Sequence, residues 1–397
     1  MPDRKRIELL APAGDLERVK IAIRYGADAV YCGGKEMSLR NRAGNLTTEE
    51  IREACRFAKE HHAKIFVTVN MIPRDEDFKD IDTYLSDLER AGVSAIIVSS
   101  PEIVKRSKIA APSMEVHLST QQSAMNSAAV NFWKEFGADR VVLARECTME
   151  EIRKIRSRTD LDLEVFIHGG MCSSYSGRCV LSNYTSARDA NRGGCAQSCR
   201  WRYREENGDR EISFGSKDLD ASRYIGEMID AGITSVKIEG RMKTAFYLAS
   251  VIRSYRYLID RYEENGILSE KDRCIASRIM GNVQNRETGP GFLEGIPGIE
   301  GLITPGTRDI VAQDYLGDIL EYDAKEMKAL VCMRNHLETG ESAEILGTGG
   351  VSDIFTVDSL TSEEGIRKEV SNRPMEKLWI PVKAPCEAGD YLRRVRK

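Results

Sequence analysis

The sequence predicts an α/β protein, a (β/α)8 TIM-like barrel with a long Cys-containing insertion before its last strand, followed by a small C-terminal β-barrel domain. Three observations predict this fold. Short β-branched runs recur eight times with helix-like stretches between them, and the joints from helix to strand repeat one pattern. After residue 265 the sequence pattern changes to a glycine- and proline-rich stretch followed by short strand-like pieces. An open doubly wound sheet is the alternative arrangement of the same elements.

The eight runs are nearly continuous apolar segments without strict alternation, which is typical of parallel strands buried on both faces. They begin at Ile7, Ala29, Lys64, Ala95, Glu115, Arg140, Leu163 and Ser235.

The stretches between the runs carry helix signals at both ends. Thr47 to Glu50 and Thr148 to Glu151 have the spacing of a capping box, which marks a helix start. Four joints share a glycine followed at once by an apolar residue and a strand, namely YGADAV, AGVSAI, FGADRV and AGITSV. A glycine that ends a helix in the left-handed conformation explains each copy.

The expected domains follow from these patterns. Residues 1–265 form the barrel with a cysteine-rich insertion at 170–217, residues 266–304 form a connector, and residues 305–397 form the small β-barrel domain. The connector includes a glycine- and proline-rich stretch without periodicity. The last part consists of short strand-like pieces separated by turn residues.

Composition indicates a soluble, cytoplasmic, globular protein. Apolar residues make up 41% and charged residues 30%, and the formal net charge is −4. No apolar stretch has signal-peptide length or the ~18 residues of a membrane span, so we expect no membrane association. Cytosolic thiols stay reduced, and a dense cysteine group there favours a metal or catalytic site over disulfides.

In such barrels the active site lies at the carboxyl ends of the strands. Reading those ends gives a polar candidate lining: Glu8, Asn70, Ser99, His117, Gln121, Arg145, Glu146, His168, Glu239 and Arg241. His117 and His168 are suited to acid–base work, with hydrogen-bonded core histidines as the alternative. Glu239 beside Arg241 could orient a guanidinium that binds an anionic substrate, or could form a structural salt bridge.

Four cysteines, Cys172, Cys179, Cys195 and Cys199, lie in the one oversized connection, at the predicted barrel mouth. Their spacing is C-x6-C-x15-C-x3-C, and only the second pair resembles a zinc knuckle. Iron–sulfur clusters also take four thiolates, with more variable spacing. The residues alone leave an iron–sulfur cluster, zinc, a catalytic thiol and a structural role open. Arg188, Arg192 and Arg200, with aromatic residues interleaved in CRWRYR, suit contact with phosphates and unstacked bases.

Taken together, these motifs resemble a known family, the bacterial collagenase-like peptidases of unassigned catalytic type. The matching segments are ELLAPAGD, ADAVYCGG, VTVN, VHLSTQ, RVVLARE, EVFIHGGMCSSYSGRCVLS, RDANRGGCAQSCRW and VKIEGRMK. The resemblance covers roughly residues 5 to 300 and, less distinctively, the C-terminal domain. One position departs from the family signature, because Gly170 stands where alanine or serine is usual.

The resemblance implies oxygen-independent hydroxylation with a 4Fe-4S cluster on Cys172, Cys179, Cys195 and Cys199. The RDANRGGCAQSCRW-type branch resembles proteins that use prephenate to form 5-hydroxyuridine at the wobble position of tRNA. It implies tRNA and prephenate, an anionic small molecule, as partners. From their positions in the chain we expect Arg145, Arg241, Arg188, Arg192 and Arg200 to be the binding residues. His117, His168 and Glu239 are the catalytic candidates.

Two other hypotheses belong to different classes. A collagenase-like peptidase would match the family label, although the sequence contains no G-x-S-x-G elbow and no HExxH motif. A non-catalytic iron–sulfur protein that pairs with a paralogous family member in a heteromer is the third hypothesis.

Overall fold

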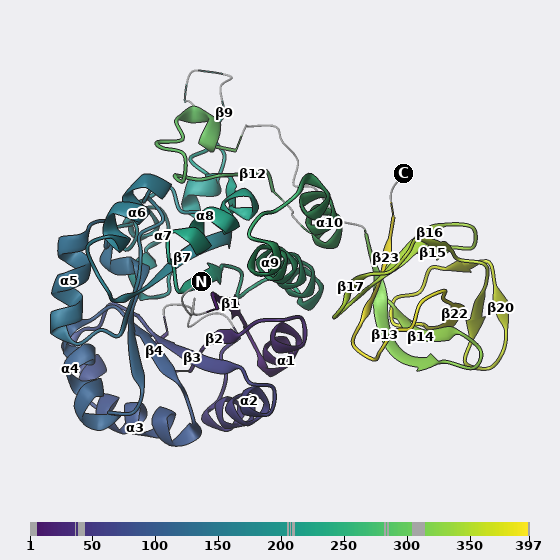
Figure 1. The fold of residues 1–397 in the computed structure, drawn as a ribbon, viewed down its shortest axis with the longest axis horizontal. Coiled ribbons are helices and arrows are strands. Elements are labelled where there is room, and N and C mark those ends of the chain that lie inside the picture. Colours follow the sequence, from purple (N-terminus) through teal and green to yellow (C-terminus); the bar gives the residue numbers. More distant parts are fainter. Residues whose placement is uncertain are drawn as a thin grey trace.

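The computed structural model describes residues 6–395 except 36, 39–43, 205, 207, 209–210, 282, 284–285 and 304–313. Its larger part is a closed barrel of eight parallel strands (Figure 1). These are β1 Glu8–Pro12, β2 Ala29–Gly33, β3 Lys64–Val69, β4 Ala95–Val98, β5 Glu115–Leu118, β6 Arg140–Val142, β7 Asp162–Gly169 and β11 Ser235–Ile238. Ser235 of β11 pairs with Glu8 on one side and Glu164 on the other, which closes the barrel. The predicted (β/α)8 fold is confirmed.

Helices alternate with the strands and surround the barrel (Figure 1). They are α1 Leu16–Arg24, α2 Thr48–Glu60, α3 Ile81–Ala91, α4 Pro101–Ala110, α5 Ser127–Phe136, α6 Met149–Arg156, α8 Ile225–Asp230 and α9 Ala245–Asn265. Both predicted capping boxes are present, at Thr47 and Thr148. Gly92 and Gly137 end α3 and α5 with positive φ angles of 94° and 110°, as the repeated joints predicted. No helix in the described part of the chain is long and apolar enough to cross a membrane.

The interior of the barrel contains a network of buried charges. Glu164 accepts from Lys237 at 2.8 Å and from Arg140 at 3.2 Å, and Arg140 also pairs with Glu8 at 2.6 Å. His117 lies edge-on to the ring of Phe66 in the same interior. Buried ions are tolerated only when they are paired, so this network fixes which side chains occupy the inside of the barrel.

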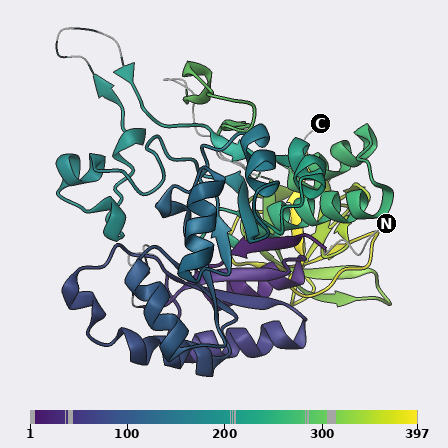
Figure 2. The same cartoon turned by 60° about the vertical axis from the view of Figure 1, so that its left-hand side comes forward.

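The predicted insertion leaves β7 and returns to it. It contains α7 Leu181–Ser186, the short helices η3 Ala190–Arg192 and η4 Ser198–Arg200, and the hairpin β8 Tyr203–Arg204 with β9 Glu211–Ile212. The following strand, β10 Asp218–Asp220, pairs antiparallel with the end of β7, and β12 Thr288–Gly289 pairs with β10. Figure 2 shows the hairpin projecting away from the barrel. Both ends of the insertion therefore lie at the barrel mouth.

The C-terminal domain is an antiparallel β-structure around its own apolar core. Its longer strands are β13 Tyr315–Asp323, β14 Lys328–Met333, β16 Ser342–Gly347, β22 Lys377–Pro381 and β23 Tyr391–Arg394. The shorter ones are β15 Leu337–Glu338, β17 Gly350–Val351, β18 Phe355–Thr356, β19 Leu360–Ser362, β20 Arg367–Lys368 and β21 Val370–Ser371. The predicted C-terminal β-domain is thus confirmed.

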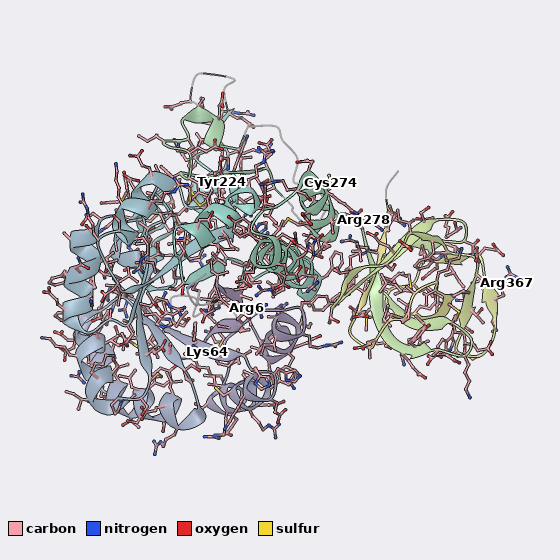
Figure 3. The ribbon with its side chains drawn as sticks, in the orientation of Figure 1. Arg6, Lys64, Tyr224, Cys274, Arg278 and Arg367 are labelled. Carbon is pink, nitrogen blue, oxygen red and sulfur yellow. The ribbon has the colours of Figure 1, made fainter. Side chains whose placement is uncertain are left out.

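The C-terminal domain packs against the helix layer of the barrel. The segment predicted as connector contains a helix, α10 Glu270–Met280, which packs on α9. Arg278 of α10 donates to Glu344 of β16 at the junction of the two domains (Figure 3). Arg393 is buried there and donates to the backbone oxygen of Ile279 at 2.7 Å. On the barrel side, Tyr25 at the end of α1 donates to the backbone oxygen of Leu346 at 3.1 Å.

Candidate functional site at the barrel mouth

A cavity of about 240 Å³ lies between the carboxyl ends of the barrel strands and the insertion. The barrel contributes the floor, with Tyr31, Thr68, Asn70, Ile97, Gln121, Arg145, Phe166, Lys237, Glu239 and Arg241. The insertion contributes the opposite wall, including Tyr175 and all four clustered cysteines. The cavity therefore exists only because the insertion folds back over the end of the barrel.

The four cysteine thiols meet at this cavity, which sequence reasoning could only infer from their position in the chain. All ten cysteines of the protein are free, and Cys172, Cys179, Cys195 and Cys199 line the same wall. Cys172 is exposed as a residue, yet surrounding atoms bury its thiol. This burial raises the pKa of the thiol, Arg145 lowers it, and the neighbouring Cys179 and Cys199 thiols raise it. The Cys172 thiol is thus close enough to those of Cys179 and Cys199 to interact with them, and Cys195 lies in the same wall.

A donor set of four thiols fits a soft metal ion or an iron–sulfur cluster in its chemistry. Within the described residues, however, no group of three or more His, Cys, Asp or Glu side chains already has the arrangement of metal ligands. The thiols share one cavity wall, and the insertion would have to draw them together to hold such a group.

The floor of the cavity is rich in cations. Arg145 stacks over the ring of Phe166 at 3.8 Å from its centroid, and its Nη2 lies 3.4 Å from Oε2 of Glu239. Arg241 is buried and donates to the hydroxyls of Ser38 and Thr68 at 3.0 and 3.3 Å. Arginines held by such contacts keep their orientation, which suits them to bind carboxylates or phosphates.

Lys237 is the third cation of the floor, and it was not among the residues predicted for the site. Its Nζ lies 4.4 Å from the centre of the Tyr31 ring and donates to Glu164 below. Among the lining residues that the structure describes, three are cations, Arg145, Lys237 and Arg241, and one is a carboxylate, Glu239. The sequence did contain a signal for Lys237. Residues two apart on a strand point to the same face, and Lys237 is two residues before the predicted site residue Glu239. The floor favours an anionic ligand.

Two glycines allow the insertion to approach the barrel. Gly169, where β7 ends, has a φ of 99°, and a Cβ there would lie 2.3 Å from the backbone oxygen of Glu239. Gly177 has a φ of 75°, and a Cβ would lie 2.1 Å from the backbone oxygen of Gln121. A side chain at either position would push the cysteine wall away from the floor.

Several polar contacts then hold the insertion in place. Glu146 accepts from the backbone nitrogen and the hydroxyl of Ser176 at 3.1 and 3.2 Å. Arg192 pairs with Asp77 at 2.6 Å, and this contact raises the pKa of Arg192. Arg200 lies 3.4 Å from Asp218 and donates to the backbone oxygen of Met171. Arg192 and Arg200, which we predicted as substrate-binding residues, thus connect the insertion to Asp77 and Asp218 in this structure. Arg188, the third predicted arginine of this segment, is half-buried within the insertion.

The two histidine candidates do not line the cavity. His117 is fully buried inside the barrel, where its Nε2 lies 3.0 Å from Glu115. His168 is also buried, but it points outward to α9, with its Nδ1 3.2 Å from the hydroxyl of Tyr255. The register between β7 and β11 shifts after Lys237, where Phe166 pairs with Lys237 and His168 with Ile238. This bulge breaks the alternation that would have turned His168 into the barrel.

His168 should make the stability of the protein depend on pH. Burial lowers the pKa of His168 to about 4, against an opposing effect of Asp220 and Asp218. The unfolded chain, with an ordinary histidine pKa of about 6.5, therefore takes up the proton at a higher pH than the folded protein does. The contribution of His168 to the free energy of unfolding is fully present above about pH 6.5, and about 3 kcal/mol of it is lost as the pH falls to 4. We expect His168→Gln to flatten the pH dependence of urea unfolding in this window. The exposed His336→Gln variant serves as control, and an unchanged slope in His168→Gln would contradict the burial argument.

Of the other predicted lining residues, Asn70, Gln121, Arg145, Glu239 and Arg241 line the cavity, whereas Glu8, Ser99 and Glu146 do not. Glu8 belongs to the charge network at the opposite end of the barrel interior, because it stands at the start of its strand.

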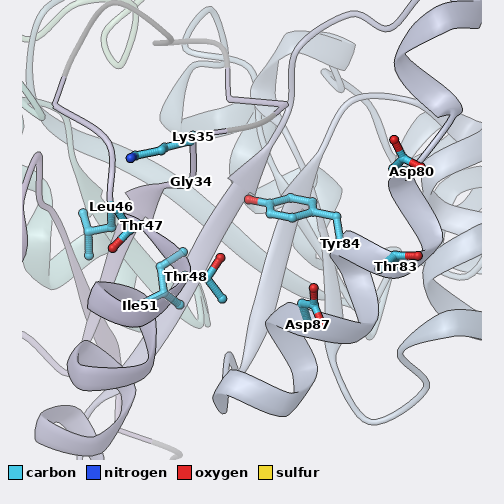
Figure 4. Close-up of a pocket in the computed structure, with 10 residues that line it drawn as sticks. All are labelled: Gly34, Lys35, Leu46, Thr47, Thr48, Ile51, Asp80, Thr83, Tyr84 and Asp87. Carbon is cyan, nitrogen blue, oxygen red and sulfur yellow. The ribbon is translucent and has the colours of Figure 1, made fainter.

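A second hollow of about 310 Å³ lies beside α2 and α3 (Figure 4). Lys35, Asp80, Tyr84 and Asp87 are among its lining residues, and its described lining contains no cysteine, histidine or arginine. Figure 4 shows Tyr84 and Asp87 on α3, Asp80 just before it and Lys35 on the loop after β2, so the hollow lacks the convergence of charges found at the barrel mouth.

Comparisons with known proteins agree with the two-part architecture. A family model described as peptidase family U32 matches residues 14–302. A second model, described as the C-terminal domain of peptidase family U32, matches residues 312–393.

Three relatives illustrate the range of names. "tRNA hydroxylation protein P1" of Bacillus subtilis (strain 168) is 43% identical and covers 94% of this chain and 91% of its own. "23S rRNA 5-hydroxycytidine C2501 synthase" of Escherichia coli (strain K12) is 34% identical, covering 82% of this chain and 48% of its own. "Collagenase" of Porphyromonas gingivalis (strain ATCC BAA-308 / W83) is 31% identical, covering 98% of each chain.

Proposed function

The chain belongs to peptidase family U32, and from this membership we propose that it is an iron–sulfur RNA-modifying enzyme. In this proposal it hydroxylates the wobble uridine of tRNA to 5-hydroxyuridine, with prephenate as co-substrate. The observation that carries the proposal is the cavity where four thiols face three cations. The names of the relatives support RNA hydroxylation as the reaction class. Work on tRNA would place the protein in the cytoplasm.

Each wall of the cavity has a role in this proposal. Cys172, Cys179, Cys195 and Cys199 would hold a 4Fe-4S cluster, which supplies redox or Lewis-acid chemistry when bound. Arg145 and Arg241 would grip the carboxylates of prephenate, and Phe166 keeps the Arg145 guanidinium flat against its ring. Glu239 is the one carboxylate among the described lining residues and the candidate to hold a proton during the reaction. The uridine would have to leave its stack to enter.

The substrate is tested by gene deletion followed by mass spectrometry of tRNA nucleosides. We expect 5-hydroxyuridine and its derivatives to disappear and to return when the wild-type gene is restored. Unchanged levels of these nucleosides in the deletion strain would refute the tRNA assignment.

The anion site is tested by a charge-removing variant. Arg145→Met retains an apolar stem over Phe166 but loses the charged hydrogen bonds, each worth ~1.5–3 kcal/mol. We therefore expect prephenate to bind roughly 10- to 100-fold more weakly, as measured by calorimetry. The exposed Arg90→Met variant on α3 should bind as the wild type does. Equal affinity in both variants would move the anion site elsewhere.

Peptide cleavage is the second candidate, favoured only by the names of the family and of one relative. All five histidines lie in the described part of the chain, and none lines the cavity. The thiols therefore have no histidine partner of the kind that activates a cysteine nucleophile. Cleavage of collagen peptides by metal-free protein would reverse this ranking. A requirement for an added paralogue would instead support the heteromer hypothesis.

A further inference from the structure

Exposed aromatic side chains are concentrated on the insertion. Five Phe, Tyr and Trp residues in the described part of the chain are exposed, and four of them lie between residues 170 and 217, about an eighth of the sequence. They are Tyr175, Tyr184, Trp201 and Phe214, and the fifth is Phe132 on α5. Aromatic rings usually bury their large apolar area, so a cluster of exposed rings indicates a surface that binds something.

The local structure holds three of these rings near the cavity. Tyr175 is 59% exposed and also lines the cavity, so it stands at the entrance. Tyr184 is 88% exposed on α7, which packs against η4 and is joined to it by a hydrogen bond of 2.6 Å between Thr185 and Ser198. Trp201 follows η4 directly and is 44% exposed. α7, η4 and the cavity wall are thus parts of one small unit.

The charge of the insertion differs from that of the whole chain. Residues 170–217 contain eight Lys and Arg residues against five Asp and Glu residues, a net charge of +3, whereas the entire protein has −4. Arg202 and Arg204 flank Tyr203, and their side chains are 61% and 70% exposed. The rings therefore stand in a positive region on an otherwise negative molecule, which favours a polyanion that carries flat apolar groups.

We propose that Tyr175, Tyr184 and Trp201 form a stacking platform for unpaired bases of an RNA loop, with Tyr175 against the nucleotide whose base enters the cavity. The idea rests on the proposed function, since it assigns to RNA the surface beside the cavity. Aromatic faces accept any base, and the surrounding arginines contact phosphates, so the platform selects single-stranded RNA over duplex.

The platform is tested by the affinity for a fluorescently labelled tRNA anticodon stem-loop and for the same stem without its loop. The variants are Tyr184→Leu and Trp201→Leu, with Tyr184→Phe and Trp201→Phe as ring-retaining partners and Phe132→Leu as the control. We expect each leucine variant to bind the stem-loop between about 5- and 100-fold more weakly, the range of one base stack. The phenylalanine variants and the control should bind nearly as the wild type does, and duplex affinity should change little.

A second readout reports stacking directly. RNA loops should quench the fluorescence of the wild type, and Trp201→Phe should lose this quenching, because Trp133 is buried on α5 and Trp379 lies in the C-terminal domain. Iron content is measured in every preparation, since Trp201 is close to Cys199 in the chain.

The outcomes separate the platform from the proposed function. If the wild type binds and modifies tRNA while the leucine variants bind as tightly as Phe132→Leu, the platform alone is wrong. If the wild type binds no RNA, the RNA substrate and the platform both fall. If the leucine variants keep RNA affinity but lose self-association or binding of another protein, the rings form a protein interface and the proposal is overturned.

Discussion

Replacement of any one of Cys172, Cys179, Cys195 or Cys199 by serine is expected to remove most of the iron and sulfide from the anaerobically purified protein and to abolish tRNA modification. All four thiols line one cavity wall, so each would supply one ligand. Loss of a ligand should reduce metal affinity or activity by more than the ~10- to 100-fold seen when only a hydrogen-bond partner of a ligand is removed. Iron and sulfide analysis with an EPR spectrum after reduction measures the first effect, and nucleoside mass spectrometry measures the second.

Cys274→Ser provides the matched control. Cys274 is an exposed thiol on α10, away from the barrel mouth (Figure 3). This variant should keep its iron and its activity. Tightly bound zinc without iron in the wild type would defeat the cluster assignment, and full iron content in all four cavity variants would place the cluster on other residues.

Glu164→Leu should be among the most destabilising single substitutions in the barrel. Burial alone would raise the pKa of Glu164, but Lys237 and Arg140 hold it below its usual value, so the carboxylate is charged. Leucine would leave Lys237 without its carboxylate partner and Arg140 with only part of its own, and both of these cationic residues are buried. Breaking a buried pair from one side costs about 3–5 kcal/mol, which urea unfolding monitored by circular dichroism can measure.

Two further variants separate this cost from general damage. Glu150→Gln removes one partner of an exposed i,i+4 pair with Lys154 on α6 and should change stability by no more than ~0.5 kcal/mol. Glu164→Leu combined with Lys237→Met removes both charges and should regain part of the lost stability. If the double variant is as unstable as the two single losses combined, packing rather than charge explains the effect.

The fold was predictable because it depends on local patterns that repeat. The eight apolar runs, the joint glycines such as Gly92 and Gly137, and the capping boxes at Thr47 and Thr148 each report on a few neighbouring residues. Eight copies of one unit leave few alternative topologies. The helix α10 was not predicted because a stretch rich in glycine and proline follows it directly, and the whole segment was therefore interpreted as an extended connector.

The site was predictable only in part, because side-chain direction depends on contacts far along the chain. Arg145, Glu239 and Arg241 follow strand ends and line the cavity as expected. His168 was misplaced by a bulge that appears only when β7 pairs with β11. Arg192 and Arg200 have partners at Asp77 and Asp218 that no local pattern reveals.

The position of the C-terminal domain has a consequence for how the chain is completed during synthesis. The barrel closes where β11 meets β1, and the helices nearest this seam are α9 and α1. Phe246 of α9 stacks on Tyr315 at 4.8 Å between ring centroids, and Tyr25 beside α1 contacts Tyr391. Domains usually fold in the order in which they leave the ribosome. The first and last helices of the barrel already pack against each other, and the C-terminal domain adds its contacts to both sides of this seam only after the final strands have been translated.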